Sequence, residues 1–573
     1  MKRFSLKWVL LCLLVPASLA IAQTATTSLR GSIKDPSGAL VPHAKVTITD
    51  KSTSASFAAM TSDSGEYIFV QIPPAKYTIT VFATGFGDQS KYAELLVNQP
   101  ATIDFALAIQ ASSVTVDVSA TAQTLNTVDA SLGNSVAHFL IEAIPTETRN
   151  VPDLLALQPG VFYLPPTLLD GRSGAVNGGR SDQGNITIDG IDDNDQVNGY
   201  AFTGVLRQTQ DSIEEFRVTT SNANADAGRS SGAQISMVTK SGTNKFHGAA
   251  YEYHRPTFTV ANNWFNKQAQ FNSGRPNIPG KLIRNIFGAD VGGPIMKNKL
   301  FFFVNYEGKR QAENAQVTQI VPTATYQQGL ITFPSKTGGG LTTLSASDIA
   351  ALDAGCKICN TTEYPQPAGA NPNVLAMFKS MPTANGTTQA DGYNEGSYSF
   401  SSHNPVDWDT YIAKLDYVPS DKQRIFARGE NQKDVTSATE QFPGQGPSSI
   451  NSSNNKGIIG GHTWTIRTNL VNDLRAGYIR GGSSVRGIGK GDYVTFRFLS
   501  APTSQTRTTM ASTPVTNVVD NLSWIEGNHT LQFGANWRLI HQDHSTDTNS
   551  YNGATANPLL ALSRCAGFKC GCD

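Results

Sequence analysis

Residues 408–431 read WDTYIAKLDYVPSDKQRIFARGEN, and this stretch decides the fold class. Two sets of residues alternate here, which is the period-two pattern of a β-strand with two different faces: the apolar or aromatic Tyr411, Ala413, Leu415 and Tyr417, and the polar Thr410, Lys414 and Asp416. Residues 419–422 contain the Pro, Ser and Asp of a tight turn, and a second strand is expected over 423–431. The stretch therefore predicts an antiparallel hairpin.

The same alternation recurs through the C-terminal half of the chain. Most of the predicted strands have roughly nine to eleven residues, the length that a tilted transmembrane strand needs. A soluble sandwich would show similar faces, but here short and long connections alternate strictly, as in outer-membrane barrels with short periplasmic turns and long external loops. Nine strands are predicted, near 245–254, 283–292, 299–308, 408–418, 423–431, 457–466, 471–480, 517–525 and 529–540.

Composition and charge support a mainly β protein and exclude one class of partner. The 45 Lys and Arg residues balance the 45 Asp and Glu residues, so the chain lacks the basic excess typical of nucleic-acid binding. Charged residues make up only 16% of the chain, and Gly, Asn, Ser and Thr are abundant, which suits strands joined by polar turns. We expect outer-membrane lipid, and no nucleic acid, around this protein.

The first residues predict export. Lys2, Arg3 and Lys7 precede an apolar run over 8–15, and Ala20-Ile21-Ala22 supplies a small-x-small cleavage pattern. The run is shorter than the about 20 apolar residues that span a bilayer, so residues 1–22 are predicted to be a signal peptide. No later segment is apolar for that length, and only a closed barrel would then insert the mature chain in a membrane.

Residues 23–110 predict a small β-sandwich, because alternating strands are separated by turns that contain Gly or Pro. The segment resembles the carboxypeptidase regulatory-like domain, which implies a transthyretin-like sandwich without catalytic residues. The matching pieces are GSIKD at 31–35, PHAKV at 42–46, GEY at 65–67, Pro73, Tyr77 and Gly85-Phe86.

Residues 111–242 carry an ordered set of short motifs. They are LLALQPGV at 154–161, where a short helix is expected, GGR at 178–180, NITIDGI at 185–191, IEEFRV at 213–218, GRSSG at 228–232 and QISMVTKSGTN at 234–244. In this order they resemble the α/β plug domain of TonB-dependent outer-membrane receptors, in the Oar-like form that also carries the regulatory-like sandwich. The resemblance marks six plug-motif residues: Gly179, Arg180, Asp189, Gly190, Gly228 and Arg229.

This resemblance implies a transporter in the outer membrane of a Gram-negative type cell. It would bind an unknown external ligand and import it to the periplasm with energy from the periplasmic TonB protein. Of the plug residues, Arg180, Asp189 and Arg229 are expected to hold the plug together or to the barrel wall rather than to contact substrate.

TonB would add a strand to an extended segment before the plug, an interaction that depends on backbone hydrogen bonds. The candidate segment consists of Val114, Thr115, Val116, Asp117 and Val118, and the last strand of the preceding sandwich is an equal alternative for it.

Several patterns that could carry chemistry are better explained without it, so we predict no enzyme, no catalytic residue, no metal site and no cofactor. The GRSSG motif at 228–232 matches a hydrolase nucleophile elbow, but a strand follows it where that motif needs a helix. Asp189, Asp192, Asp193 and Asp195 lack EF-hand spacing, and turns account for them. Cys356 and Cys359 suggest a local disulfide; Cys565, Cys570 and Cys572 receive no role.

Residues 243–573 are predicted to form only part of a barrel. Nine is an odd strand count, a barrel wide enough for a plug has about 22 strands, and the sequence ends in a Cys-rich tail without strand pattern. We therefore expect a fragment of a longer receptor. Four aromatic residues are expected in interface girdles if the barrel prediction holds: Trp464, Tyr478, Trp524 and Trp537.

Two other classes of function remain open on the sequence alone. An exported surface adhesin or carbohydrate-binding protein would explain the signal, the sandwich and the polar loops, but not the alternating connections or the plug motifs. A secreted hydrolase would require a catalytic constellation that the sequence does not supply.

Overall fold

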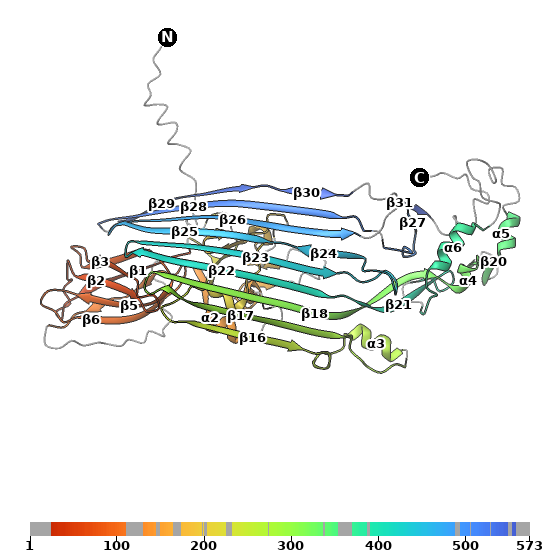
Figure 1. Ribbon diagram of the computed structural model, residues 1–573, viewed down its shortest axis with the longest axis horizontal. Helices are drawn as coiled ribbons and strands as arrows, with labels where there is room; N and C mark the ends of the chain where they lie inside the picture. Colours follow the sequence, from red (N-terminus) through yellow and green to blue (C-terminus); the bar gives the residue numbers. More distant parts are fainter. Residues whose placement is uncertain are drawn as a thin grey trace, which may run out of the picture.

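The structure is a computed structural model, and three of its parts follow one another along the chain (Figure 1). The chain is mainly β, as the sequence predicts. The model describes residues 25–573 except 110–129, 145–148, 150, 164–173, 198, 200–202, 225–227, 229–231, 273, 336–338, 353–369, 387–389, 488–492, 505, 528, 548–552 and 557–573.

Residues 25–109 form two sheets packed face to face, here called the sandwich. Alternating side chains of both sheets meet in one apolar core that includes Leu29, Ile48 and Tyr77, all of them fully buried. One sheet contains β1 (Thr27–Lys34), β4 (Glu66–Ile72), β7 (Ala101–Thr102) and β8 (Phe105–Ala106); the other has the order β3 (Ser56–Met60), β2 (Lys45–Asp50), β5 (Ala75–Phe82) and β6 (Gln89–Leu95).

Residues 131–242 form a mixed sheet with short helical segments, here called the plug. Strands β12 and β15 pair in parallel, and the other neighbours are antiparallel. The strand order is β13 (Ile191–Asp192), β12 (Asn185–Ile188), β15 (Gln234–Thr239), β14 (Ile213–Ser221) and β9 (Leu132–Ala137). Helix α2 (His138–Ala143) follows β9, and the expected helix near 154 is the 3-10 helix η1 (Val151–Leu157). Two further strands, β10 (Val161–Tyr163) and β11 (Gly174–Val176), pair with each other.

The turn between β12 and β13 consists of Asp189 and Gly190. Both residues have positive φ, 46° and 82°. Asp tolerates this left-handed conformation better than most residues and Gly adopts it without steric cost, so the Asp-Gly pair is suited to a two-residue hairpin turn.

The C-terminal part of the chain is one antiparallel sheet, and all nine strands predicted from the sequence are confirmed. Within the described residues the sheet contains twelve strands. The three besides the nine predicted strands pair with members of the nine, and they are β21 (Glu395–His403), β24 (Ser449–Ser453) and β30 (Asp543–Thr546). The nine are β16 (His247–Arg255), β17 (Leu282–Met296), β18 (Leu300–Pro322), β22 (Val406–Ser420), β23 (Gln423–Ser437), β25 (Lys456–Arg467), β26 (Leu470–Gly487), β28 (Thr509–Glu526) and β29 (His529–Ile540).

The predicted strand length of about ten residues is wrong for most of these strands. Strand β18 has 23 residues, and β26 and β28 have 18 each. At about 3.3 Å per residue, β18 is far longer than an apolar band of about 25 Å. The strands lengthen toward the long loops, because cross-strand pairing continues beyond the apolar residues that the sequence pattern detects.

Apolar side chains lie on the outer face of this sheet and polar ones on the inner face. On β22, Tyr411 and Leu415 are 49% and 48% exposed, whereas Lys414 is buried. The girdle residues Trp464, Tyr478, Trp524 and Trp537 are 39–55% exposed rather than in a core. Tyr478 pairs with Ile458, six positions from Trp464 along β25, so the two aromatic levels lie roughly 20 Å apart.

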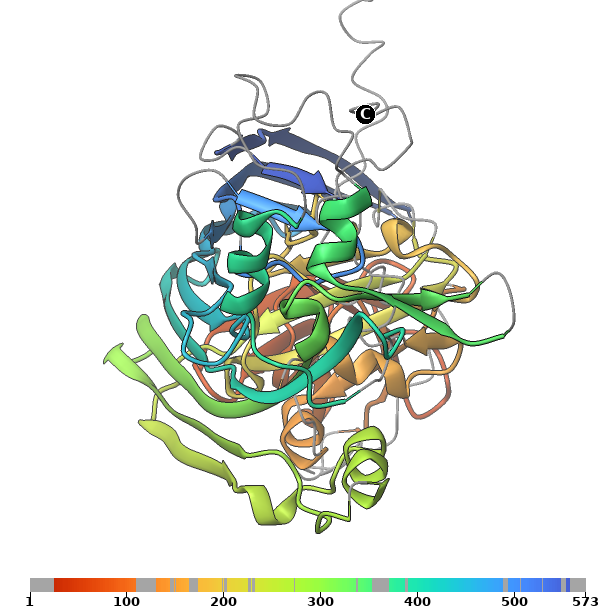
Figure 2. The same ribbon diagram turned by 90° about the vertical axis from the view of Figure 1, so that its right-hand side faces the viewer.

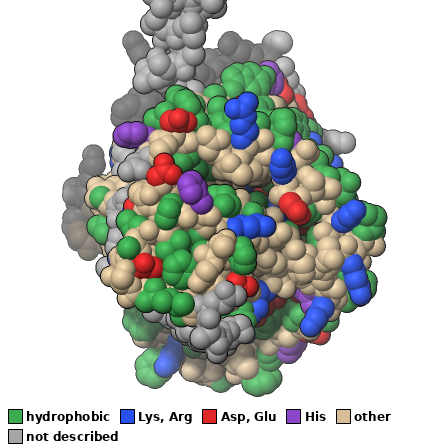
Figure 3. All heavy atoms as spheres, turned by 90° about the vertical axis from the view of Figure 1, so that its left-hand side faces the viewer, with side chains coloured by type: hydrophobic (Ala, Val, Ile, Leu, Met, Phe, Trp, Pro, Cys, Tyr) green, Lys and Arg blue, Asp and Glu red, His purple; other side chains and the backbone are tan. Residues whose placement is uncertain are grey.

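The sheet curves around the plug, and its two ends differ (Figures 1 and 2). The sandwich lies at the end with the short turns, which is the periplasmic end in outer-membrane barrels. In Figure 3 the described residues of the sandwich cover this end of the molecule. None of the described helices has the length and apolarity to cross a membrane.

The opposite end carries the long loops. A small apolar core joins these loops, and it includes Tyr326, Phe378 and Phe496. The loop elements are η4 (Thr257–Thr259), α3 (Trp264–Asn272), α4 (Ala324–Gln327), β19 (Ile331–Pro334), β20 (Leu341–Leu344), α5 (Ala346–Leu352), α6 (Pro372–Ser380), β27 (Tyr493–Phe496) and β31 (Gly553–Ala556).

Candidate functional site

The plug and the inner face of the sheet share one apolar core. Ile459, Ile479 and Val519 of the sheet belong to the same buried cluster as the plug strands. At Gly477 of β26, an added Cβ would come within 2.7 Å of the Ile191 side chain, so this plug side chain packs directly against the wall backbone there. The plug is therefore packed into the sheet and does not merely lie beside it.

Asp189 is the centre of a charged contact between plug and wall. Its carboxylate accepts hydrogen bonds from the backbone N–H of Thr239 at 3.0 Å and from its hydroxyl at 2.6 Å. Lys414 Nζ and Arg428 Nε, both from the wall, lie 3.6 and 3.7 Å from the carboxylate oxygens. Arg475 donates to the Asp189 carbonyl at 2.7 Å. Burial raises the pKa of Asp189, but Lys414, Arg428 and the hydrogen bonds from Thr239 together outweigh burial and hold the pKa below its usual value.

A second contact of the same kind lies further along β23. Arg428 pairs with Glu430 of its own strand and donates to Oε1 of Gln208, a plug residue, at 2.9 Å. Gln208 in turn donates to Glu430 at 3.1 Å. Nearby, Arg207 of the plug bonds Asp434 of the wall at 2.7 and 3.0 Å. Charged side chains of the plug thus contact the wall, and charged side chains of the wall contact the plug.

Two more ion pairs fix the sides of the plug. Arg149 of the plug contacts Asp211 at 2.5 Å and Glu307 of β18 at 3.3 Å. On the far side, Asp192 of the plug pairs with Arg538 of β29. Buried pairs of this type lose much of their Coulomb energy to desolvation, but removing one partner is strongly destabilising. The arrangement fixes one position of the plug inside the curved sheet.

The predicted plug-motif residues separate into two groups. Asp189 and Gly190 lie at the wall, and a Cβ at Gly190 would meet the Arg475 side chain at 2.7 Å. Asp189 lies 3.6 Å from Lys414 of the wall, and its expected role, to hold the plug together or to the wall, stays a prediction. Arg180, by contrast, forms an exposed ion pair with the neighbouring Asp182, and Gly179 lies beside it in a turn. Gly228 accepts a weak bond from Gln234 within the plug at 3.5 Å.

Other predicted residues lie outside the described part of the chain. These are the signal peptide 1–22, the TonB-contact candidates 114–118, Arg229, Cys356, Cys359 and the three C-terminal cysteines. Among the described residues, no three His, Cys, Asp or Glu side chains gather in a way that could hold a metal ion. Asp189 and Asp192 both face basic side chains of the wall.

The wall partners Lys414, Arg428 and Arg475 are missing from the sequence prediction. Their position along the strands was the available signal. Each lies at a strand position whose side chain points into the barrel, and a buried charged side chain there needs a partner. The partner itself could not be read, since Asp189 is more than two hundred residues away in the sequence.

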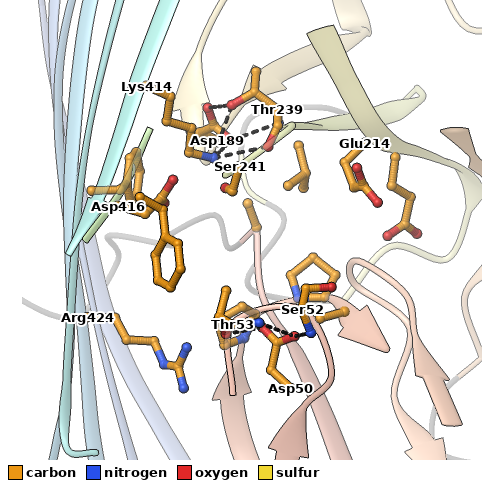
Figure 4. Close-up of a pocket in the computed structure, with 18 of the residues that line it drawn as sticks. Asp50, Ser52, Thr53, Asp189, Glu214, Thr239, Ser241, Lys414, Asp416 and Arg424 are labelled. Atoms are coloured by element: carbon orange, nitrogen blue, oxygen red, sulfur yellow. Dashed lines mark hydrogen bonds and ion pairs between the residues drawn. The ribbon is translucent and has the colours of Figure 1, made fainter. Parts of the chain in front are cut away.

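A cavity of about 450 Å³ lies where the sandwich, the plug and the wall meet (Figure 4). Polar side chains from all three parts surround it, and in Figure 4 Arg424 extends from the wall toward Thr53 of the sandwich. Its lining includes Asp50, Ser52 and Thr53 of the sandwich, Glu214, Thr239 and Ser241 of the plug, and Lys414, Asp416 and Arg424 of the wall.

Glu215 joins the plug to the sandwich next to this cavity. The side chain is buried, and its two carboxylate oxygens accept the backbone N–H of Val97 at 3.0 and 3.1 Å. Burial raises the pKa of Glu215 to about 8; the Val97 N–H and Arg217 oppose this shift, whereas Glu94 and Glu214 add to it. The docked sandwich therefore favours the protonated carboxyl.

We expect contact between sandwich and plug to weaken as pH rises. With a docked pKa of about 8 and an ordinary value of 4.5, Glu215 stabilises docking fully below pH 4.5, and this contribution is lost as pH rises through 8. The loss should reach roughly 2–4 kcal/mol. Limited proteolysis at pH 6 and pH 9 measures it, and Glu215→Gln should remove the difference. Equal cleavage of the parent protein at both pH values would contradict this.

The fold and the plug together define the class of protein. A curved antiparallel sheet has an apolar outer face with aromatic levels and an inner face that binds a plug, which is the construction of an outer-membrane β-barrel. Residues 238–558 match the outer membrane beta barrel domain family, and residues 28–108 match the carboxypeptidase regulatory-like domain. The chain belongs to the outer membrane beta barrel domain family, and the protein is located in the outer membrane.

One curated protein is similar to about half of this chain. The chain is 25% identical over 308 residues to the TonB-dependent transporter Oar of Myxococcus xanthus, covering 51% of this chain and 27% of Oar. About half of this chain is thus similar to part of a TonB-dependent transporter.

Solved structures of similar shape include two receptors. The outer membrane transporter YddB from Escherichia coli has a TM-score of 0.46 and 14% identity, covering 72% of this chain and 48% of that one. The siderophore receptor PirA from Acinetobacter baumannii has a TM-score of 0.41 and 12% identity, also covering 72% and 48%. The chain spans about half of these structures and about a quarter of Oar.

Proposed function

We propose that the protein takes up an external ligand and admits it to the periplasm when TonB displaces the plug. The observation that carries this proposal is the charged contact around Asp189, where one plug carboxylate faces Lys414 and Arg428 of the wall. Such a contact holds the plug in one position, yet water can solvate its separated partners once the plug moves. An adhesin would have no use for a plug anchored in this way.

The external ligand would first meet the long loops. These loops share an apolar core around Phe378 and Phe496, whose rings lie 5.0 Å apart, so they present a preformed surface. The proposed TonB contact is the segment 114–118, where strand addition would depend on backbone groups more than on side chains.

Binding to the periplasmic domain of TonB tests this proposal. Val116→Pro removes one backbone donor and fixes φ, so the purified chain should bind TonB at least about tenfold more weakly. Thr115→Ala is the matched control, because it keeps both backbone groups, and should bind like the parent. Calorimetry measures both affinities.

The two ways of failing are distinct. If Val116→Pro binds as tightly as the parent, the TonB contact lies elsewhere in the chain. If neither protein binds TonB, energy coupling by TonB should be abandoned for this chain.

A further inference from the structure

The sandwich contacts both the plug and the barrel wall, at widely separated points. Besides the Val97–Glu215 bonds, Asn98 Nδ2 donates to Ser236 Oγ of the plug at 2.9 Å. Gln71 Nε2 donates to the carbonyl of Asn521 in β28 at 3.3 Å. A third contact, the Asn244 N–H to the Ser52 carbonyl at 3.0 Å, joins the sandwich to the start of the sheet. The sandwich thus bridges the short-turn end of the sheet.

The chemistry of this interface differs from that between plug and wall. The plug shares an apolar core with Ile459, Ile479 and Val519, whereas the buried core of the sandwich, among the described residues, contains sandwich residues alone. Hydrogen bonds, which include those to the buried Glu215, and the stacking of Arg424 over Phe57 at 4.2 Å hold the sandwich in place. Polar groups can be solvated after separation, so the sandwich should detach more readily than the plug.

The cavity lies where detachment of the sandwich would open it. It lies between the sandwich on one side and the plug and wall on the other, with Asp50 and Thr53 below and Ser241 and Lys414 above (Figure 4). A solute that passes the plug on this side enters the cavity before it reaches the end of the sheet. The sandwich lies across the rest of this path, between the cavity and the end of the sheet.

We propose that the sandwich is a second gate, which closes the periplasmic mouth below the plug and opens by undocking as a folded unit. The cavity is then a compartment between two closures that open separately. The role of the gate in passage rests on the proposed transport function, but docking and undocking are properties of the chain itself and can be measured without TonB or ligand.

Thiol labelling tests the gate. In a background with the native cysteines changed to Ser, Ser241→Cys places a thiol in the cavity, and Ser37→Cys places one on an exposed turn of the sandwich. A maleimide too bulky for a cavity of about 450 Å³ should label Ser241→Cys much more slowly than Ser37→Cys.

Substitution of Gln71 and Asn98 should weaken the contacts that hold the gate closed. Both have positive φ, 53° and 50°, so Gln71→Gly and Asn98→Gly remove interface side chains while the backbone keeps its conformation. With two hydrogen bonds lost, labelling of Ser241→Cys should rise roughly thirtyfold. His43→Gly is the matched control: its φ is 55° and its exposed side chain contacts Asp63, away from the interface.

The outcomes separate clearly. A rise with the paired glycines and none with His43→Gly, at an unchanged circular dichroism spectrum and unchanged Ser37→Cys labelling, supports the gate. Equal labelling of both thiols in the parent overturns it, because the sandwich would then not cover the cavity. Slow labelling that the paired glycines leave unchanged also overturns it, since these contacts would not hold the closure. None of these results depends on whether TonB binds.

Discussion

Asp189→Asn should lower the free energy of unfolding by about 3–5 kcal/mol, the cost of removing one partner from a buried charged group. The neutral amide keeps the left-handed turn, since Asn tolerates positive φ, but it removes the carboxylate that faces Lys414 and leaves Arg428 paired with Glu430 alone. Thermal unfolding of the purified protein in detergent measures the loss, and proteolysis of the plug should accelerate in parallel.

Two further variants make this prediction specific. Asp182→Asn changes an exposed ion pair of the same plug, whose partners are 67% and 46% exposed, and should alter stability by less than about 1 kcal/mol. Lys414→Met in the Asp189→Asn background removes one unpaired charge and should restore part of the stability. If Asp182→Asn and Asp189→Asn have equal effects, Asp189 is not the anchor of the plug.

Gly31→Val should unfold the sandwich while the barrel sheet stays folded. A Cβ at Gly31 would lie 1.8 Å from the carbonyl oxygen of Ile103 and 2.9 Å from the Tyr67 ring. The oxygen cannot retreat, because the Ile103 N–H bonds Arg30 at 2.8 Å and the Tyr67 hydroxyl bonds that same oxygen at 2.6 Å. Forced overpacking of this kind costs about 3 kcal/mol or more.

Limited proteolysis followed by mass spectrometry checks this result. Cleavage should concentrate in residues 25–109, and fragments of the C-terminal sheet should persist. Gly429→Val is the control, since it makes the same change in strand β23, where a Cβ would meet nothing within 4 Å. Wild-type resistance of the Gly31→Val sandwich would show that β1 can shift away from Ile103.

Alternation of side chains along each strand is a local property, and for that reason the sequence predicted the nine strands and the outward positions of Trp464 and Trp537. The Asp189-Gly190 turn was similarly readable, because its conformation depends on these two residues themselves. The lengths of the strands were not readable. Pairing beyond the apolar band depends on the neighbouring strand, as in β18, whose outer half pairs with β21.

The sequence by itself determined the mainly β class, the sandwich, the order of the plug motifs and the strand positions, because each depends on contacts within a hairpin or a turn. Only the tertiary structure decided which charges meet. Asp189 contacts Lys414 and Arg428, and Val97 contacts Glu215. In each case the partners are too far apart in the sequence for a local pattern to predict the contact. The raised pKa of Glu215 has the same origin, since burial against the docked sandwich, rather than the residue's neighbours in sequence, is its main cause.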